Sequence, residues 1–409
     1  MKTKPLIIGI LVATGATVAY FPAIQQAVAT TTKMIKTPPT IISPVNRLPV
    51  VANQPPQIEV VFVLDTTGSM GGLIAAAKEK IWSIASTMAS SQTAPEIKMG
   101  LIAYRDRGDA YVTQIIALSS DLDSMYAKLM DFQADGGGDG PESVNETIHV
   151  AVNKISWSQN PNTYKVIFLV GDAPPHMDYQ DDVKYPITVA LAKQKGIIVN
   201  TIQCGQDSSA TADWQQVANL GQGSYFQVEQ SGNAIAIATP YDKKLAELST
   251  KLDKTRLFYG NEEEKAKQES KLAATDKLHK EASTESQARR ATFNTSASGK
   301  ANLLGENELV DSVVSGRIKL SSLPKESLPE KLQAMSPAAQ EEFVGKTKQE
   351  RSELESEIKR LAEHRNDYLR QKVVAEGGKE DSLDVKLYGA IRDQGKAKGL
   401  VYETSSAKY

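Results

Sequence analysis

Short apolar runs that end in polar turns recur through the first 240 residues. Four of them, at 58–64, 97–104, 165–170 and 196–203, have the length and continuity of strands buried on both faces. A fifth, at 111–118, is expected to pair with the second run as a hairpin. Helical patterns separate the runs, at about 70–90, 120–132, 141–157, 180–195, 209–220 and 239–257. This alternation predicts an α/β fold, a doubly wound and mostly parallel sheet covered by helices on both faces.

The pattern changes after residue 242. Residues 1–242 contain 16 basic and 21 acidic side chains, whereas residues 243–409 contain 31 and 28. The charge density more than doubles, so we expect a compact domain at 57–242 followed by a charged, mainly α-helical region at 243–409. Within that region, 243–300 is expected to be a solvated helix or partly disordered, and a long helix should start near Pro337 and run to about 374.

The long helix carries a short apolar seam. Leu354, Ile358 and Leu361 have coiled-coil spacing, but Arg365 interrupts the repeat. The seam is short for a coiled coil. We therefore expect an αα-hairpin packed on itself or on the first domain, with self-association through the helices as the alternative.

The composition excludes several classes of protein. The net charge of −2 argues against a general nucleic-acid binder, which normally shows a basic face. A single cysteine, Cys204, cannot form an intrachain disulfide or a cysteine-based zinc site. The four histidines are not clustered, which argues against a histidine-ligated transition metal.

The N-terminus has the pattern of a secretory signal. Lys2 and Lys4 precede an apolar run from Pro5 to Phe21, and the small-residue pattern Ala27-Val28-Ala29 follows. We interpret 1–29 as a signal peptide, with an uncleaved N-terminal membrane anchor as the alternative, and the proline-rich segment 30–56 as an extended linker. Export is the expectation in either case.

Oxygen-bearing side chains follow two of the predicted strands. The first strand ends in Asp65-Thr66-Thr67-Gly68-Ser69, where alternate residues of an extended turn can converge, and the fourth ends in Gly171-Asp172. In a parallel sheet these ends meet at one edge, where ligands bind. Carboxylates and hydroxyls are hard ligands suited to Mg²⁺, Mn²⁺ or Ca²⁺. Asp139 lies between them in the glycine-rich loop 136–140, and Pro141 is expected to open the next helix.

With these residues the chain resembles a von Willebrand factor type A domain carrying a metal-ion-dependent adhesion site, over about residues 57–240. Asp65, Thr67 and Ser69 match the Asp-x-Ser-x-Ser motif of the family, and Asp172 matches its last Asp. Asp139 stands where the family has Thr, which departs from the pattern. The segments Tyr104-Arg105-Asp106 and 136–142 resemble a bacterial and alpha-kinase-associated branch of the family.

The resemblance implies a function as well as a fold. We expect a divalent cation, Mg²⁺ first and Mn²⁺ or Ca²⁺ otherwise, held by Asp65, Thr67, Ser69, Asp139 and Asp172. A carboxylate of a protein partner would complete the coordination of that cation. Direct coordination by Asp139 would strengthen the hold on the metal and weaken its attraction for an incoming carboxylate. The expected role is metal-dependent protein–protein interaction or adhesion at a bacterial envelope or in the periplasm.

Two other functions stay open. The domain could be an accessory subunit that positions a separate ATPase or enzyme, or the protein could be a structural scaffold that acts through its helical tail. We expect no catalytic activity of its own, because no nucleophile has a base placed beside it and the helical region has no kinase motif. Of the weaker signals, Arg107-Gly108-Asp109 is interpreted as turn chemistry and Cys204 as a small buried residue. His176 is interpreted as a supporting or loop residue. Glu142 is expected to stabilise the N-terminus of the helix at 141–157 by its charge, with a water-mediated contact to the site as the alternative.

Overall fold

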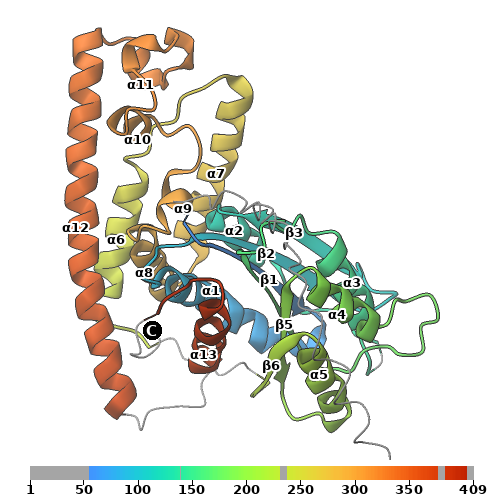
Figure 1. The fold of residues 1–409 in the computed structure, drawn as a ribbon. Coiled ribbons are helices and arrows are strands. Elements are labelled where there is room, and N and C mark those ends of the chain that lie inside the picture. The colour runs from blue at the N-terminus through green and yellow to red at the C-terminus, as the bar shows by residue number, and fades with distance from the viewer. Residues whose placement is uncertain (1–54, 139, 231–236, 376–382, 403–409) are drawn as a thin grey trace, which may run out of the picture. The chain divides into compact units, whose positions relative to one another are not determined.

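The computed structural model describes residues 55–138, 140–230, 237–375 and 383–402. The expected signal or anchor, most of the linker and Asp139 therefore lie outside the described residues. The described chain forms a central sheet with helices on both faces and a group of further helices contributed by residues 242–375 (Figure 1). None of the described helices combines the length and apolar character needed to cross a bilayer.

The sheet has six strands in the order β3-β2-β1-β4-β5-β6. The strand β3 runs antiparallel to β2, and every other neighbouring pair is parallel. This topology confirms the predicted doubly wound, mostly parallel sheet. The strands are β1 (Gln57–Asp65), β2 (Glu96–Tyr104), β3 (Thr113–Ser119), β4 (Tyr164–Gly171), β5 (Ile197–Cys204) and β6 (Gln222–Val228).

Alternate side chains of the central strands point to opposite faces of the sheet and pack in two separate hydrophobic cores. From β1, Val60 and Phe62 enter one core with α1, α2 and α13, whereas Val61 and Val63 enter the other with α3, α4 and α5. Phe62 stacks on Phe168 of the neighbouring β4 with ring centroids 5.6 Å apart. The helices are α1 (Gly71–Ala89), α2 (Leu122–Asp131), α3 (Val144–Asn153), α4 (Tyr185–Gln194), α5 (Ser208–Leu220) and α13 (Leu383–Lys396). Because both faces are covered, the central strands consist almost entirely of buried residues, as their sequences predict.

Two boundaries differ from the prediction. The helix α3 begins at Val144 rather than Pro141, because Glu142 forms an isolated parallel bridge with Pro175 and holds the preceding residues in an extended conformation. The helix α4 begins at Tyr185 rather than near residue 180, with a proline in its first turn. Both differences keep loops, rather than helix ends, beside the carboxyl edge of the sheet.

The charged region after residue 242 forms ordered helices. These are α6 (Asp242–Asp253), α7 (Glu262–Glu281), α8 (Thr284–Asn294), α9 (Lys300–Leu304), α10 (Leu309–Val314), α11 (Glu330–Gln333) and α12 (Pro337–Ala375). The predicted seam on α12 packs against Leu245, Leu248 and Leu252 of α6. Arg365 continues the buried face because its Nε donates a 2.7 Å hydrogen bond to Asp242. Residues 243–300 are therefore neither one solvated helix nor partly disordered, because they form α6, α7, α8 and the start of α9.

The last helix returns to the sheet. Leu387 and Ile391 of α13 are buried in the core that contains α1 and β1. The Oε1 of Gln394 accepts a 2.8 Å hydrogen bond from the hydroxyl of Tyr164 and a 3.2 Å bond from the amide of Asn200. One face of the sheet is thus covered partly by α13, which follows the end of the last strand, Val228, by more than 150 positions.

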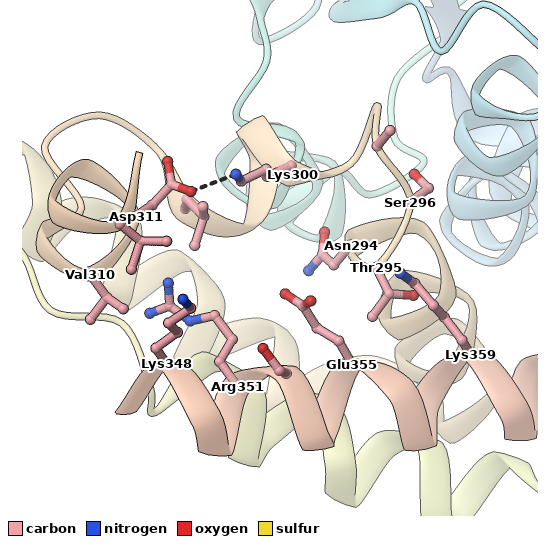
Figure 2. A pocket seen from close by; sticks show the side chains of 14 residues that line it. Asn294, Thr295, Ser296, Lys300, Val310, Asp311, Lys348, Arg351, Glu355 and Lys359 are labelled. Atoms are coloured by element: carbon pink, nitrogen blue, oxygen red, sulfur yellow. Dashed lines mark ion pairs between the residues drawn. The ribbon is translucent and has the colours of Figure 1, made fainter. Parts of the chain in front are cut away.

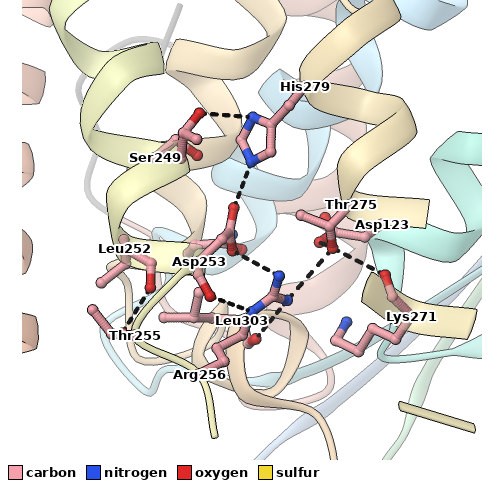
Figure 3. Close-up of polar contacts among 12 residues, drawn as sticks. Asp123, Ser249, Leu252, Asp253, Thr255, Arg256, Lys271, Thr275, His279 and Leu303 are labelled. Carbon is pink, nitrogen blue, oxygen red and sulfur yellow. Dashed lines mark hydrogen bonds and ion pairs between the residues drawn. The ribbon is translucent and has the colours of Figure 1, made fainter. Parts of the chain in front are cut away.

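A buried ionic network joins the helices to the sheet domain. Figure 3 shows the part of it around Asp253, where Arg256 and His279 both contact this carboxylate. The guanidinium of Arg290, on α8, donates to both oxygens of Asp123 on α2 and to both oxygens of Asp253 on α6. His279 of α7 lies with its Nε2 2.7 Å from the Oδ2 of Asp253. The opposite charges offset the desolvation of three fully buried ionic groups, and the network fixes α2, α6 and α8 relative to one another.

Candidate functional site

The end of β1 turns its polar residues toward the carboxyl edge of the sheet. Asp65 is fully buried, and its Oδ1 accepts hydrogen bonds from the backbone N–H (2.8 Å) and hydroxyl (2.7 Å) of Thr67. Its other oxygen, Oδ2, has no hydrogen-bond partner. A buried carboxylate oxygen without a partner is costly unless a cation or water satisfies it.

Burial raises the pKa of Asp65 to about 7. The two hydrogen bonds from Thr67 and the nearby phenol of Tyr104 oppose this pKa rise, and the charge of Asp172 adds to it. Tyr104 lies close to Asp65 without forming a hydrogen bond of regular geometry. The surroundings of Asp65 therefore disfavour its ionised carboxylate unless a proton or a bound cation neutralises the charge.

The end of β4 places Asp172 at the same edge. Its Oδ2 accepts a 2.6 Å hydrogen bond from the side-chain amide of Gln230, which follows β6. Gln230 also lies 3.3 Å from the backbone oxygen of Ser69. Ser69 is exposed in a short 3₁₀ turn, Gly68–Met70, that leads into α1. The expectation that β1 and β4 bring their terminal residues together is met, and Gln230 joins them.

The glycine-rich loop is held against this edge by its backbone. Gly136 and Gly137 have φ of +79° and +82°, a conformation that side-chain-bearing residues rarely adopt. The N–H of Gly137 donates to the carboxylate of Asp109, at 3.1 and 3.3 Å, and the oxygen of Gly136 accepts a 3.1 Å bond from Gly68. A Cβ at Gly136 would overlap the Asp109 carboxylate. Asp139, the remaining predicted ligand, lies outside the described residues.

Arg105 is a supporting residue that the sequence indicated only as part of a segment resembling the family, without a role of its own. Its guanidinium is buried, donates to the backbone oxygens of Thr66 (3.1 Å) and Gln133 (2.8 Å), and lies 4.6 Å from the ring centre of Tyr111. These bonds tie the end of β1 to the segment that enters the glycine-rich loop. The unusual burial of an arginine after a strand could not be inferred from its residue type.

Glu142 takes a larger part than the prediction gave it. It precedes α3 rather than lying in its first turn, and its Oε2 is buried without a hydrogen-bond partner. Burial, followed by the charges of Asp65, Asp106, Asp109 and Asp172, raises the pKa of Glu142 to about 9. The carboxyl group of Glu142 thus lies among acidic side chains, and no basic side chain among the described residues contributes to this pKa shift.

These residues surround a cavity of about 280 Å³. Its lining includes Thr67, Ser69, Glu142, Asp172 and Gln230, together with the backbone of Gly136 and Gly137. Asp65 does not line the cavity; it lies one layer deeper and positions Thr67. Among the described residues, no three His, Cys, Asp or Glu side chains gather as a metal-binding group. The donor set nevertheless fits a hard cation, provided that hydroxyls and water supply part of the coordination.

Two weaker signals now have structural explanations. The turn interpretation of Arg-Gly-Asp rests on Asp109, whose N–H donates to the backbone oxygen of Asp106 at 3.3 Å. Arg107 pairs instead with Asp181 (2.9 Å) and Asp182 (2.5 Å) of the β4–α4 loop. His176 is buried, stacks on Tyr179 with centroids 3.9 Å apart, and lies 2.8 Å from Asp178. Both residues brace the loops beside the cavity and do not line it. Cys204 is buried, as predicted, although it also contributes to the cavity lining.

Two solved structures are similar to part of the chain at low sequence identity. The von Willebrand factor A domain of SpRpn10 is 14% identical with a TM-score of 0.34, over 44% of this chain and 90% of that one. Proximal thread matrix protein 1 from the mussel byssus, solved with a zinc-occupied adhesion motif, is 13% identical with a TM-score of 0.34. This match covers 42% of this chain and 41% of that one.

Sequence comparisons identify the domain. The chain is 29% identical over 119 residues to an ariadne-like RING finger protein of Acanthamoeba polyphaga mimivirus, which is 29% of this chain and 11% of that protein. It is 38% identical over 91 residues to von Willebrand factor A domain-containing protein 7 of Rattus norvegicus. This alignment covers 22% of this chain and 10% of that protein. The chain thus spans about a tenth of the length of these relatives. Residues 59–239 match the family model described as von Willebrand factor A domain. Residues 59–239, less than half of the chain, therefore form a von Willebrand factor A domain.

Proposed function

We propose that the protein binds a divalent cation at the carboxyl edge of its sheet and, through that cation, a carboxylate of a protein partner. The observation that carries the proposal is the cavity between Ser69, Asp172 and Glu142, beside which two buried carboxylate oxygens have no hydrogen-bond partner. Von Willebrand factor A domains commonly mediate protein–protein interaction. The family and the site chemistry therefore agree on the kind of role.

The residues define what each would contribute. Thr67 and Ser69 would offer hydroxyl oxygens and Asp172 a carboxylate, whereas Asp65 would act through Thr67 and through water. Glu142 is a further candidate because its carboxyl group lines the cavity. A bound cation would supply the positive charge that this acidic cluster lacks, and Mg²⁺ is the first expectation for a set of oxygen donors that keeps several waters.

Location and activity belong to the same proposal. The basic start, apolar run and Ala27-Val28-Ala29 pattern support export to a bacterial periplasm or envelope. We propose an interaction protein rather than an enzyme, because no nucleophile in the sequence has a base placed beside it and the helical region has no recognisable kinase motif. The scaffold and accessory-subunit roles are alternatives that metal-independent function of the chain would favour.

Calorimetric titration tests the cation site. Mg²⁺, Mn²⁺, Ca²⁺ and Zn²⁺ are titrated into the full chain and into variants Ser69→Ala and Asp172→Asn. We expect saturable binding of at least one ion that weakens about tenfold or more in both variants. Asp276→Asn, which changes an exposed carboxylate on α7, is the matched control and should bind as the wild type does. Absence of binding to the folded wild type, or binding unchanged in both site variants, would refute the proposal.

A further inference from the structure

A second cavity lies in the helical region, away from the sheet. It has a volume of about 340 Å³, which is in the range of small-molecule sites. Its walls come from α8, α9, α10 and α12 (Figure 2). None of its lining residues lines the proposed cation site, so the two cavities are separate.

The floor of this cavity contains an amide whose orientation is fixed. Asn302 accepts a 3.0 Å hydrogen bond from the backbone N–H of Asp123, so its Oδ1 and Nδ2 are assigned by the network. That Nδ2 donates to the Oδ1 of Asn294 at 2.8 Å. The Nδ2 of Asn294 must then be the remaining donor, and it is buried with no partner while Asn294 is only 2% exposed. A fixed, buried and unsatisfied N–H donor in a cavity wall indicates an acceptor group on a ligand.

The charged residues around the cavity divide into paired and unpaired groups. Lys300 pairs with Asp311, and Arg351 donates to Glu308 and to Thr255. Within the described part of the chain, Lys348, Lys359 and Glu355 form no ion pair or side-chain hydrogen bond. Figure 2 shows Glu355 and Lys359 reaching from α12 toward Asn294 and Thr295. The cavity thus contains, among the described residues, hydrogen-bond donors without a partner, on Asn294 and Lys359, next to the unpaired carboxylate of Glu355.

We propose that this cavity binds a small zwitterion of the amino-acid class. The ligand's carboxylate would accept from the Nδ2 of Asn294 and from the ammonium of Lys359, and its ammonium would donate to Glu355. A simple anion would use the Asn294 donor and the lysines but would gain nothing from Glu355, whereas a simple cation would leave the Asn294 donor without an acceptor. A molecule with both groups uses Asn294, Lys359 and Glu355 at once.

Calorimetry on the full chain tests the assignment. L-alanine and L-glutamate are the probes, and acetate, ethylammonium and inorganic phosphate carry one charge type each. We expect at least one amino acid to bind saturably and each single-charge probe to bind at least tenfold more weakly. Asn294→Asp keeps the acceptor for Asn302 but removes the free donor, and should weaken amino-acid binding about tenfold or more.

Two further variants separate binding from folding. Lys359→Ala changes an exposed residue of α12 and should weaken binding even if Asn294→Asp does not fold. Lys346→Ala, on the same helix but outside the cavity, should bind as the wild type does. The proposal is overturned if neither amino acid binds at millimolar concentration, if phosphate binds and the amino acids do not, or if Lys359→Ala and a folded Asn294→Asp both leave the affinity unchanged.

Discussion

Arg290→Met tests whether the buried ionic network holds the helices to the sheet domain. The substitution keeps an unbranched apolar side chain and removes the charge. In the native chain Arg290 is fully buried and donates to Asp123, to Asp253 and, at 2.9 Å, to the hydroxyl of Ser249. Without it, Asp123 loses its paired guanidinium, and Asp253 keeps only the longer 3.5 Å pair with Arg256 and the contact with His279. Breaking a buried pair in this way costs about 3–5 kcal/mol of unfolding free energy.

The dependence on pH gives a second signature of the same loss. Burial alone would raise the pKa of Asp123, but the charge and hydrogen bonds of Arg290 hold this pKa well below its usual range, and they help to lower the pKa of Asp253 to about 2. A lowered carboxyl pKa stabilises the folded state above the unfolded pKa of about 3.9, and that stability is lost as the pH falls through the folded value. In Arg290→Met, burial is no longer opposed by Arg290 and the folded pKa values should rise. The deficit of the variant should therefore shrink between pH 7 and pH 5.

Urea denaturation followed by circular dichroism measures both effects. Arg370→Met is the matched control, because Arg370 forms an exposed pair with Asp367 on α12 and should change the unfolding free energy by less than about 1 kcal/mol. A loss below about 1 kcal/mol for Arg290→Met at pH 7, or a deficit that grows on acidification, would refute the network as the main link between α2, α6 and α8.

Three further substitutions have defined outcomes. Gly136→Ala should weaken cation binding in calorimetry by about tenfold or more, since it combines a positive φ with overlap on the Asp109 carboxylate, whereas Gly138→Ala, with open space around it, should not. Asn261→Ala removes the capping box of α7 and should lower the unfolding free energy by about 1 kcal/mol in urea denaturation. Phe168→Ala empties the centre of the sheet and should cost about 3–5 kcal/mol in the same assay.

The sheet was largely predictable because its central strands are buried on both faces. The runs at 58–64, 97–104 and 165–170 each lie within an observed strand, and 196–203 is displaced by one residue. The strand β6 was not predicted. It lies at the edge of the sheet and most of its residues are only half-buried, so Gln222–Val228 has no continuous apolar run. An edge strand of this kind is recognised by its neighbours and not by its own sequence.

The residue types of the candidate site were predictable from the sequence, but which of them line the cavity and which lie behind it was not. Spacing predicted that Thr67, Ser69 and Asp172 would converge, and all three line one cavity. It could not predict that Asp65 would lie behind Thr67, nor that Glu142 would enter the lining, because both depend on how the loops pack. The contribution of Asp109 depends on a loop contact between residues 28 positions apart. Whether the predicted ligands bind metal stays a prediction.

Anomalous diffraction from crystals soaked with Mn²⁺ tests the central claim most directly, because it locates the ion independently of any effect on stability. The account predicts one strong peak in the cavity at the carboxyl edge of the sheet, with the oxygens of Thr67, Ser69 and Asp172 in its first or water-mediated coordination shell. The peak should disappear in crystals of Ser69→Ala, Asp172→Asn. Well-ordered loops with no peak at this edge, or a peak held by residues elsewhere, would contradict the account.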